Sequence, residues 1–347
     1  MLLEAIHRAC RRPWTVMEVC GGQTHALLRH GIDQLLPPQL TLIHGPGCPV
    51  CVTSSEHLDR AMALAAEPDV ILCSYGDMLR VPGSDGRDLL QIRGQGGAVR
   101  IVYSPLDVLT IAQENPHRRV VFLAVGFETT APATALLAQR ALASGLSNLE
   151  LLVCHVRVPP VLDQMLSDPA CRVQGVLAAG HVCAVMGDAE YQPLVSRHRR
   201  PIVITGFSAE ELLRGILACI QQLEAGEHRL ENAYRPVVKP SGNGDGRRLI
   251  EQVFEPVDPL WRGLGVIPAG GYRLRPPFDQ LAAPMQPLKL TSQAESPPPC
   301  PAGEVLQGLM RPDQCPHFGS ACTPDHPLGA PMVSSEGACA AYNRYRR

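Results

Sequence analysis

The sequence predicts an α/β protein in which parallel sheets are flanked by helices. Short apolar runs of strand length alternate with segments of helical periodicity, and many of these runs end in glycine-bearing turns. The longest apolar runs are far shorter than a membrane span. Alternation of this kind is typical of parallel sheets whose two faces are covered by helices.

The expected strands occupy the first two-thirds of the chain, and several lead directly into glycine-bearing turns. We expect strands at residues 15–19, 40–43, 70–73, 99–103, 120–125, 151–154, 173–177 and 201–205. Open α/β sheets bind their ligands at the carboxyl ends of the strands. Residues in the turns that follow these strands are therefore the first candidates for function.

The length of 347 residues predicts more than one hydrophobic core. We expect an α/β domain over residues 1–119, a second α/β domain over residues 120–235 and a C-terminal unit over residues 236–347. The last boundary rests on composition, because proline and glycine become frequent after about residue 235. The end of the chain combines four cysteines with little periodic pattern, and a metal cluster is one device that would order it.

Composition narrows the class of function. The net charge is −2, no basic cluster stands out and aromatic residues make up 4%, which argues against nucleic acid as a partner. The N-terminus does not read as a secretory signal, so we expect a soluble, cytoplasmic protein without a membrane partner. In a reducing compartment, thirteen cysteines indicate metal ligation or thiol chemistry rather than structural disulfides.

Four cysteines near the C-terminus are candidate cluster ligands. Cys300, Cys315, Cys322 and Cys339 form the pattern C-x14-C-x6-C-x16-C. Four thiolates suit a cubane iron–sulfur cluster or zinc, but zinc sites usually bring their cysteines in closely spaced pairs. Glycines and prolines flank the thiols, as close wrapping of backbone around a cluster requires. The alternative is four ordinary thiols that are buried as small apolar groups.

A second group of cysteines lies near the N-terminus. Cys20 belongs to the motif MEVCGGQTH, and Cys48 and Cys51 belong to GPGCPVC. A C-P-x-C turn after a strand brings two thiols close enough for a reversible disulfide, and a helix that starts there lowers a thiol pKa. The alternative is half of a zinc site that Cys20, His25 or His44 would complete.

Three further polar residues follow expected strands. Glu128, in the motif GFETT, would be able to take or give a proton, and the threonines after it would cap a helix whose free N–H groups hold an anion or polar ligand. The alternative is a plain cap and a solvated glutamate. His155 and His181 are each as consistent with a hydrogen-bonded structural role as with a site role.

Taken together, these motifs resemble those of the HypD family of hydrogenase maturation factors. In chain order they are MEVCGGQTH, GPGCPVCV, GFETTAP, VPP after His155, AGHV around His181, WRGLGVIP from Trp261, and the terminal CTP and MVSSEGACAAY. Each motif is short, but their joint occurrence in this order is highly specific and covers nearly the whole chain.

The resemblance implies α/β domains and a C-terminal part that binds a [4Fe–4S] cluster through Cys300, Cys315, Cys322 and Cys339. Proteins of this family act with the small chaperone HypC as a scaffold for the Fe(CN)2CO group of [NiFe]-hydrogenases. Cyanide is supplied by HypF and HypE, and HypE joins a transient complex. The resemblance further implies that Cys20 helps to hold the iron and that Cys48 and Cys51 form a redox pair. We expect HypC to bind near Cys20.

A few positions depart from the family pattern. Pro331 and Ala302 stand where many relatives have further cysteines, but neither position belongs to the four-cysteine spacing. Gln23 stands where some relatives have histidine, which puts a ligand role at that position in doubt. Cys183 stands where serine is usual.

Two other functions stay open beside the redox-active assembly scaffold. A thiol–disulfide oxidoreductase with an electron-transfer cluster would need Cys48 and Cys51 but not Cys20. A zinc protein without catalytic activity would need neither iron nor a reversible disulfide.

Overall fold

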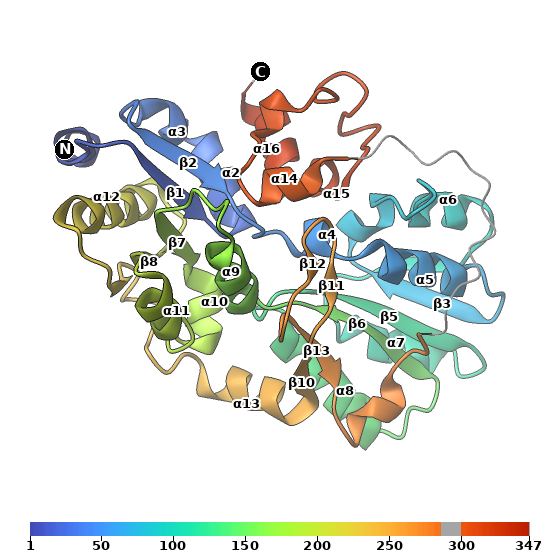
Figure 1. Cartoon of the computed structure of the whole chain (residues 1–347). Helices are drawn as coiled ribbons and strands as arrows, with labels where there is room; N and C mark the ends of the chain where they lie inside the picture. Colours follow the sequence, from blue (N-terminus) through green and yellow to red (C-terminus); the bar gives the residue numbers. More distant parts are fainter. Residues whose placement is uncertain (286–299, 347) are drawn as a thin grey trace.

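The computed structural model describes residues 1–285 and 300–346, and two parallel sheets form its frame (Figure 1). One sheet has five strands in the order β2-β1-β7-β8-β9, and the other has four strands in the order β4-β3-β5-β6. These strands are β1 (Trp14–Glu18), β2 (Leu40–His44), β3 (Val70–Ser74), β4 (Val99–Ile101), β5 (Arg119–Gly126), β6 (Leu149–His155), β7 (Gly175–Ala179), β8 (Ile202–Thr205) and β9 (Leu230–Asn232). The predicted α/β class is confirmed.

The pairing of the strands does not follow the boundary that we expected between residues 119 and 120. β1 pairs with β7 in parallel, from Val16 opposite Gly175, so the start of the chain shares a sheet with residues beyond 170. β3, β4, β5 and β6 form the other sheet together. Most of these strands are buried almost throughout, and such strands carry little sequence information about which neighbour they pair with.

Helices cover both sheets. Those around the five-stranded sheet include α1 (Leu2–Ala9), α2 (Gly21–Arg29), α10 (Gly180–Met186), α11 (Tyr191–His198) and α12 (Ala209–Ala225). Those around the four-stranded sheet include α5 (Ser55–Ala65), α6 (Leu89–Gly94), α7 (Asp107–Glu114) and α8 (Ala131–Ala143). We call each sheet together with its helices a unit. α12 begins with a reciprocal capping box between Ser208 and Glu211 and ends at Gly226 in the left-handed conformation. Its bounds are therefore set by local sequence.

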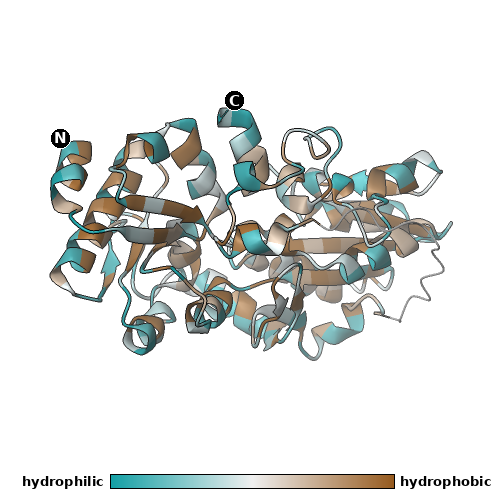
Figure 2. Ribbon diagram, turned by 45° about the horizontal axis from the view of Figure 1, so that its top comes forward, coloured by the Kyte–Doolittle hydropathy of each residue, from teal (hydrophilic) through white to brown (hydrophobic). Residues whose placement is uncertain are grey.

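One apolar core crosses from sheet to sheet. Met17 and Val176 of the five-stranded sheet belong to the same buried cluster as Leu72 and Val121 of the four-stranded sheet. Figure 2 shows the apolar residues concentrated on the strands, with hydrophilic residues on the outer faces of the helices. Because the two units share a core, a continuous packed interior fixes them against each other.

The expected C-terminal unit, residues 236–347, divides into two parts. Its first part contains α13 (Gly244–Val253), β10 (Phe254–Val257), β11 (Leu260–Trp261), β12 (Gly265–Val266) and β13 (Gly271–Leu274). α13 packs on α8, and β13 packs on β6, so this part extends the four-stranded unit. Residues 286–299 lie outside the described residues.

Residues 300–346, which we call the C-terminal lobe, lie across the junction of the two sheets (Figure 1). The lobe contains α14 (Ala302–Leu306), α15 (Ala330–Val333) and α16 (Ala338–Tyr345). α16 packs on α2 of the five-stranded unit, and α15 packs on the short helix α4 (Pro49–Val52). An ion pair joins Arg346 to Asp33, and the Ser334 hydroxyl donates to Asp77 at 2.8 Å. The lobe therefore contacts both units at once.

Within the described residues, no helix combines the length and the apolar character that a membrane crossing requires.

Candidate functional site

Cys20 lies at the N-cap of α2, two residues after β1. Its side chain is 3% exposed, and its sulfur lies 3.6 Å from Nε2 of His181, at the start of α10. Gly47 packs directly on the Cys20 backbone, because a Cβ at position 47 would lie 2.3 Å from the Cys20 nitrogen. The Gly21 N–H donates to the Gly47 carbonyl at 2.8 Å. The CGG turn and the GPGC turn are thus packed backbone to backbone.

A buried carboxylate holds this turn in place. One oxygen of Glu18 accepts the Cys20 N–H at 2.8 Å, and the other accepts the Thr24 hydroxyl and lies 2.7 Å from Nδ1 of His44. Glu18 is fully buried at the end of β1. Its partners satisfy both oxygens, which burial of a carboxylate requires. Glu18 therefore positions Cys20 through the Cys20 backbone rather than through the thiol.

The histidines that we predicted as ligands lie against other partners. His44 contacts Glu18 and packs edge-on against Tyr342, with ring centroids 5.5 Å apart. His25 lies 3.0 Å from the hydroxyl of Tyr345. The imidazole that the structure places against the Cys20 thiol belongs to His181.

The surroundings of Cys20 favour its neutral thiol. Burial is the main cause that raises the thiol pKa, and the charges of Glu18 and Glu336 raise it further. Backbone N–H groups of the turn act in the opposite direction and lower it. Burial also lowers the pKa of His181, whose ring stacks on Phe207 with centroids 4.9 Å apart. A neutral imidazole and a thiol that loses its proton on binding form a donor pair for a soft metal ion.

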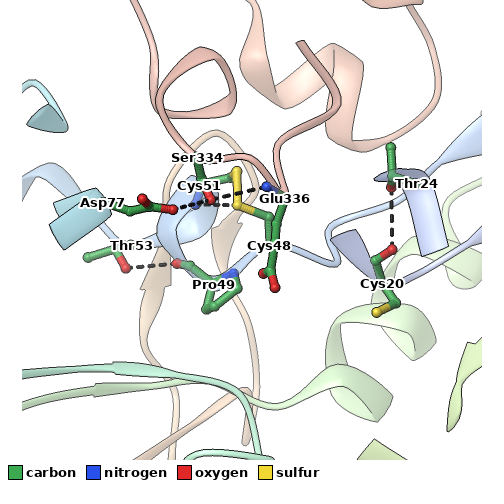
Figure 3. Close-up of a disulfide and its surroundings, with 9 residues drawn as sticks. All are labelled: Cys20, Thr24, Cys48, Pro49, Cys51, Thr53, Asp77, Ser334 and Glu336. Carbon is green, nitrogen blue, oxygen red and sulfur yellow. Dashed lines mark hydrogen bonds between the residues drawn. A yellow bond between two sulfur atoms is a disulfide. The ribbon is translucent and has the colours of Figure 1, made fainter. Parts of the chain in front are cut away.

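Cys48 and Cys51 are joined by a disulfide across α4, with their Cα atoms 5.2 Å apart (Figure 3). Cys48 is the N-cap of this helix, and the Cys51 N–H donates to the Cys48 sulfur at 3.1 Å. The C-P-x-C turn thus brings its two sulfurs together as predicted. The zinc alternative requires both sulfurs as thiolates, whereas in this structure they are bonded to each other.

The C-terminal lobe contributes a segment to the same region. Glu336 packs on the first turn of α2, because a Cβ at Gly21 would lie 2.5 Å from the Glu336 Cβ. Its N–H donates to the Ser334 hydroxyl at 3.3 Å, and Ser334 in turn donates to Asp77 (Figure 3). Desolvation raises the pKa of Glu336, and the charge of Asp77 adds to it. A carboxyl group from the end of the chain therefore stands near Cys20.

The four C-terminal cysteines line a single cavity. Its wall consists of Cys300, Cys315, Cys322 and Cys339 together with residues that include Pro301, Val305, His317, Phe318, Gly329, Pro331 and Met332. Burial raises the pKa of the Cys339 thiol, and the neighbouring charges of Cys300, Cys322 and Cys315 add to it. The four sulfurs thus act on one another across the cavity.

The donor set of this cavity fits an iron–sulfur cluster. Four soft sulfur donors converge, and the Leu328 N–H donates to the Cys322 sulfur at 3.4 Å, as hydrogen bonds to cluster sulfurs do. Gly329 is required for space, since a Cβ there would lie 2.3 Å from the Cys300 sulfur. Among the described residues, no three His, Cys, Asp or Glu side chains are arranged to hold a single metal ion. Four cysteine thiolates are the ligand set that a [4Fe–4S] cluster takes.

Glu128 follows β5 in the four-stranded unit. It is 1% exposed, so the alternative of a solvated glutamate is wrong. One oxygen accepts the Val158 N–H at 2.9 Å, and the other has no partner in the described part of the chain. Burial raises the pKa of Glu128 to about 7. Its charge acts on the buried Cys183 and Tyr191, so it belongs to a buried polar cluster between the units.

Two expectations about the same region are settled by hydrogen bonds. Thr130 is the N-cap residue of α8, but its hydroxyl donates back to the Phe127 carbonyl at 3.2 Å and makes no capping hydrogen bond to the helix. His155 is buried, its Nε2 lies 2.9 Å from the Thr134 hydroxyl, and burial lowers its pKa to about 4. The Thr134 contact agrees with the structural alternative, whereas Nδ1 of His155 is buried without a partner among the described residues.

A family model described as "HypD: Hydrogenase formation hypA family" matches residues 1–346. The chain belongs to the HypD family. The hydrogenase maturation factor HypD of Escherichia coli (strain K12) is 45% identical over 337 residues, which cover 97% of this chain and 90% of the relative. HypD of Rhizobium leguminosarum bv. viciae is 42% identical over 343 residues, covering 97% and 89%. HypD of Azotobacter vinelandii is 44% identical over 344 residues, covering 97% and 90%.

This HypD-family chain is accordingly a hydrogenase maturation factor, and its motifs meet in space. The CGGQTH and GPGCPVC motifs pack on each other, the AGHV motif supplies His181, and the terminal SSEG segment joins them. Sequence reasoning missed Glu18. The available signal was an acidic residue at the end of an apolar strand, where an unpaired charge is costly.

Proposed function

We propose that this chain is a redox-active cytoplasmic scaffold on which the Fe(CN)2CO group of [NiFe]-hydrogenases is assembled together with HypC. One observation carries the proposal. A single short turn, Gly45 to Cys51, both packs on the buried Cys20 and carries the disulfide. A group held at Cys20 would therefore sit beside a two-electron store that belongs to the same piece of backbone.

Cys20 and His181 are the donors that we assign to the iron of the cargo. A thiolate is a soft ligand suited to low-spin Fe(II) with cyanide and CO, and the neutral imidazole is a further donor. Binding of the iron displaces the thiol proton, which the raised pKa of Cys20 otherwise retains. HypC would bind near Cys20, so that both proteins reach the same iron.

Cys48 and Cys51 supply the electrons in this proposal. Release of cyanide from a thiocyanate on HypE takes up two electrons and leaves a thiolate on HypE. Oxidation of the two thiols to the Cys48–Cys51 disulfide releases two electrons and two protons. The HypE thiolate takes up one proton, the other passes to solvent, and the cyanide passes to the iron. The disulfide in the structure corresponds to the state after such a delivery.

The cavity of Cys300, Cys315, Cys322 and Cys339 would hold a [4Fe–4S] cluster, which supplies single electrons when bound. The chain's own part is to fix the four thiols around the cavity. α15 contributes Pro331 and Met332 to the cavity wall and also packs on α4. α15 therefore contacts both the cavity and the helix that carries the disulfide.

Infrared spectroscopy of the anaerobically purified complex with HypC tests the proposal. We expect cyanide and CO bands from the wild-type complex and none from the Cys20→Ala complex, with the iron–sulfur content unchanged. Cys219→Ser is the matched control, because Cys219 is also a buried thiol of the five-stranded unit but belongs to a different apolar cluster from Cys20. Equal bands from the Cys20→Ala complex would refute the assignment.

The disulfide is also consistent with a second function, that of a thiol–disulfide oxidoreductase with an electron-transfer cluster. That function needs Cys48 and Cys51 but not Cys20. Maturation of hydrogenase by the Cys20→Ala variant, with loss of maturation by Cys48→Ser, would favour it over the scaffold.

A further inference from the structure

The turn between β11 and β12 contacts the disulfide-bearing helix. The Arg262 N–H donates to the Val52 carbonyl at 2.8 Å, and its guanidinium donates to the carbonyls of Thr53 at 3.0 Å and Pro82 at 2.8 Å. Val52 and Thr53 directly follow Cys51 at the end of α4. Figure 1 shows this hairpin reaching α4 from the four-stranded unit. Arg262 thus satisfies carbonyl groups that the end of a short helix leaves unpaired.

The same turn contacts the C-terminal lobe. Gly263 lies at φ +75° and packs against Gly303, because a Cβ at Gly263 would lie 2.9 Å from the Gly303 Cα. In the reverse direction, a Cβ at Gly303 would lie 2.2 Å from the Gly263 carbonyl oxygen. Gly303 is three residues after Cys300, in the first turn of α14. The turn is therefore in backbone contact with the segment that carries a cavity cysteine.

The guanidinium of Arg262 has two ionisable neighbours. It acts on the Cys300 sulfur and on the buried carboxylate of Asp59. Asp59 already accepts two hydrogen bonds from Ser84, through its N–H at 2.9 Å and its hydroxyl at 2.5 Å. Because the guanidinium donates to neutral carbonyls, its charge remains available to the cavity.

We propose that Arg262 is a positioning residue that fixes the disulfide-bearing helix α4 against the C-terminal lobe and supplies a positive charge beside Cys300. The positioning part stands on the disulfide and the three carbonyl contacts alone. The charge part rests on the proposed function, since it concerns a cluster bound by the four cysteines.

Each part has its own consequence. When α4 is fixed at its end, the thiols of the reduced pair stay close together, which favours the disulfide. Loss of the guanidinium contacts gives the dithiol more conformations, so reduction becomes easier. Loss of the positive charge makes it harder to add an electron to a neighbouring cluster, which lowers the cluster's reduction potential.

Two variants separate these consequences. Arg262→Gln removes both the charge and the planar guanidinium group. Arg262→Lys keeps the charge but loses the guanidinium N–H groups that donate to two carbonyls at once. Arg118→Gln is the matched control, because the guanidinium of Arg118 also donates to two carbonyls, those of Pro68 and Val70, in the four-stranded unit.

The test equilibrates the full chain with reduced and oxidised glutathione and measures the Cys48–Cys51 dithiol fraction by alkylation and mass spectrometry. For Arg262→Gln and Arg262→Lys we expect the equilibrium constant for reduction to rise about tenfold, or about 30 mV. Arg118→Gln should match the wild type. Constants within twofold of wild type for both folded Arg262 variants would overturn the positioning role, and Arg262→Lys decides alone if Arg262→Gln does not fold.

A potentiometric titration of the anaerobic protein, followed by electron paramagnetic resonance, tests the charge. We expect a lower cluster potential in Arg262→Gln and an unchanged one in Arg262→Lys. An unchanged potential in Arg262→Gln would overturn the charge part. A wild-type chain without a cluster would instead refute the proposed function and with it the charge part, while the glutathione measurement still decides the positioning part.

Discussion

Two buried glutamates follow apolar strands in the two units, and their partners give them different roles. Glu18 ends β1, and its oxygens are occupied by Cys20, Thr24 and His44. Glu128 follows β5, and one of its oxygens has no partner among the described residues. A buried carboxylate whose two oxygens are both occupied fixes the groups that donate to it, so Glu18 positions the site. Burial raises the pKa of Glu128 to about 7, so Glu128 is able to exchange a proton near neutral pH.

Glu128→Gln tests the titration. The folded pKa of about 7 lies above the ordinary value of 4.5, so the folded state binds the proton more tightly. Stability from this group is complete below about pH 4.5 and is lost as the pH rises through about 7. The loss is at most about 3 kcal/mol, from about 1.4 kcal/mol per pKa unit.

Thermal unfolding of wild type and Glu128→Gln at about pH 5.5 and about pH 8.5 measures this effect. We expect the variant to gain stability relative to wild type at the higher pH, because glutamine cannot ionise. Shifts common to both proteins cancel in the comparison. A difference between the two proteins that does not change with pH would contradict the assignment.

Glu18→Gln tests the positioning of Cys20. The amide replaces one acceptor oxygen by a donor, which leaves a buried donor without its partner and costs about 1–3 kcal/mol. The turn that covers Cys20 should open more often, so iodoacetamide should alkylate Cys20 faster than in wild type. Glu4→Gln, on the exposed face of α1, is the control. Unchanged alkylation in Glu18→Gln would show that the backbone contact with Gly47 suffices.

At the scale of the elements, two helices begin at the cysteines of the N-terminal group. Cys20 is the N-cap of α2, and Cys48 is the N-cap of α4. The turns before them pack without side chains between, at Gly47 against the Cys20 backbone. Glycine is needed there for close approach rather than for an unusual backbone angle.

Gly47→Ala tests this close approach. A methyl group 2.3 Å from the Cys20 nitrogen forces the two turns apart, so we expect a loss of stability of about 1–3 kcal/mol. Gly94→Ala is the control, because nothing lies within 4 Å of its Cβ position in α6 and alanine favours a helix. Thermal unfolding should fall for Gly47→Ala and stay level or rise for Gly94→Ala. Equal midpoints would contradict the packing argument.

At the scale of the whole molecule, the C-terminal lobe joins the two units above the site. Tyr342 of α16 is 2% exposed, packs edge-on against His44 and lies under the guanidinium of Arg346. Tyr342→Ala should destabilise the docking of the lobe by about 3–5 kcal/mol. Limited proteolysis should then cleave the lobe faster while the two sheets survive. Equal cleavage of variant and wild type would show that α15 alone holds the lobe.

Sequence patterns predicted the elements better than their assembly. The strands and the turns after them followed from apolar runs and glycines, because those signals are local. The sharing of one sheet by β1 and β7 did not follow, since buried parallel strands look alike in sequence. Likewise Cys20 was predicted, but its contact with His181 joins residues 161 positions apart, which no spacing rule reaches.

The lobe's four cysteines give the most direct test of the account, because the scaffold proposal requires a cluster in their cavity. Iron and acid-labile sulfide should be measured on the anaerobically purified full chain, with electron paramagnetic resonance after reduction. We predict about four iron and about four sulfide ions per chain and a cluster signal, both lost in Cys339→Ala. An iron-free chain, purified from cells with intact cluster assembly, would contradict the account.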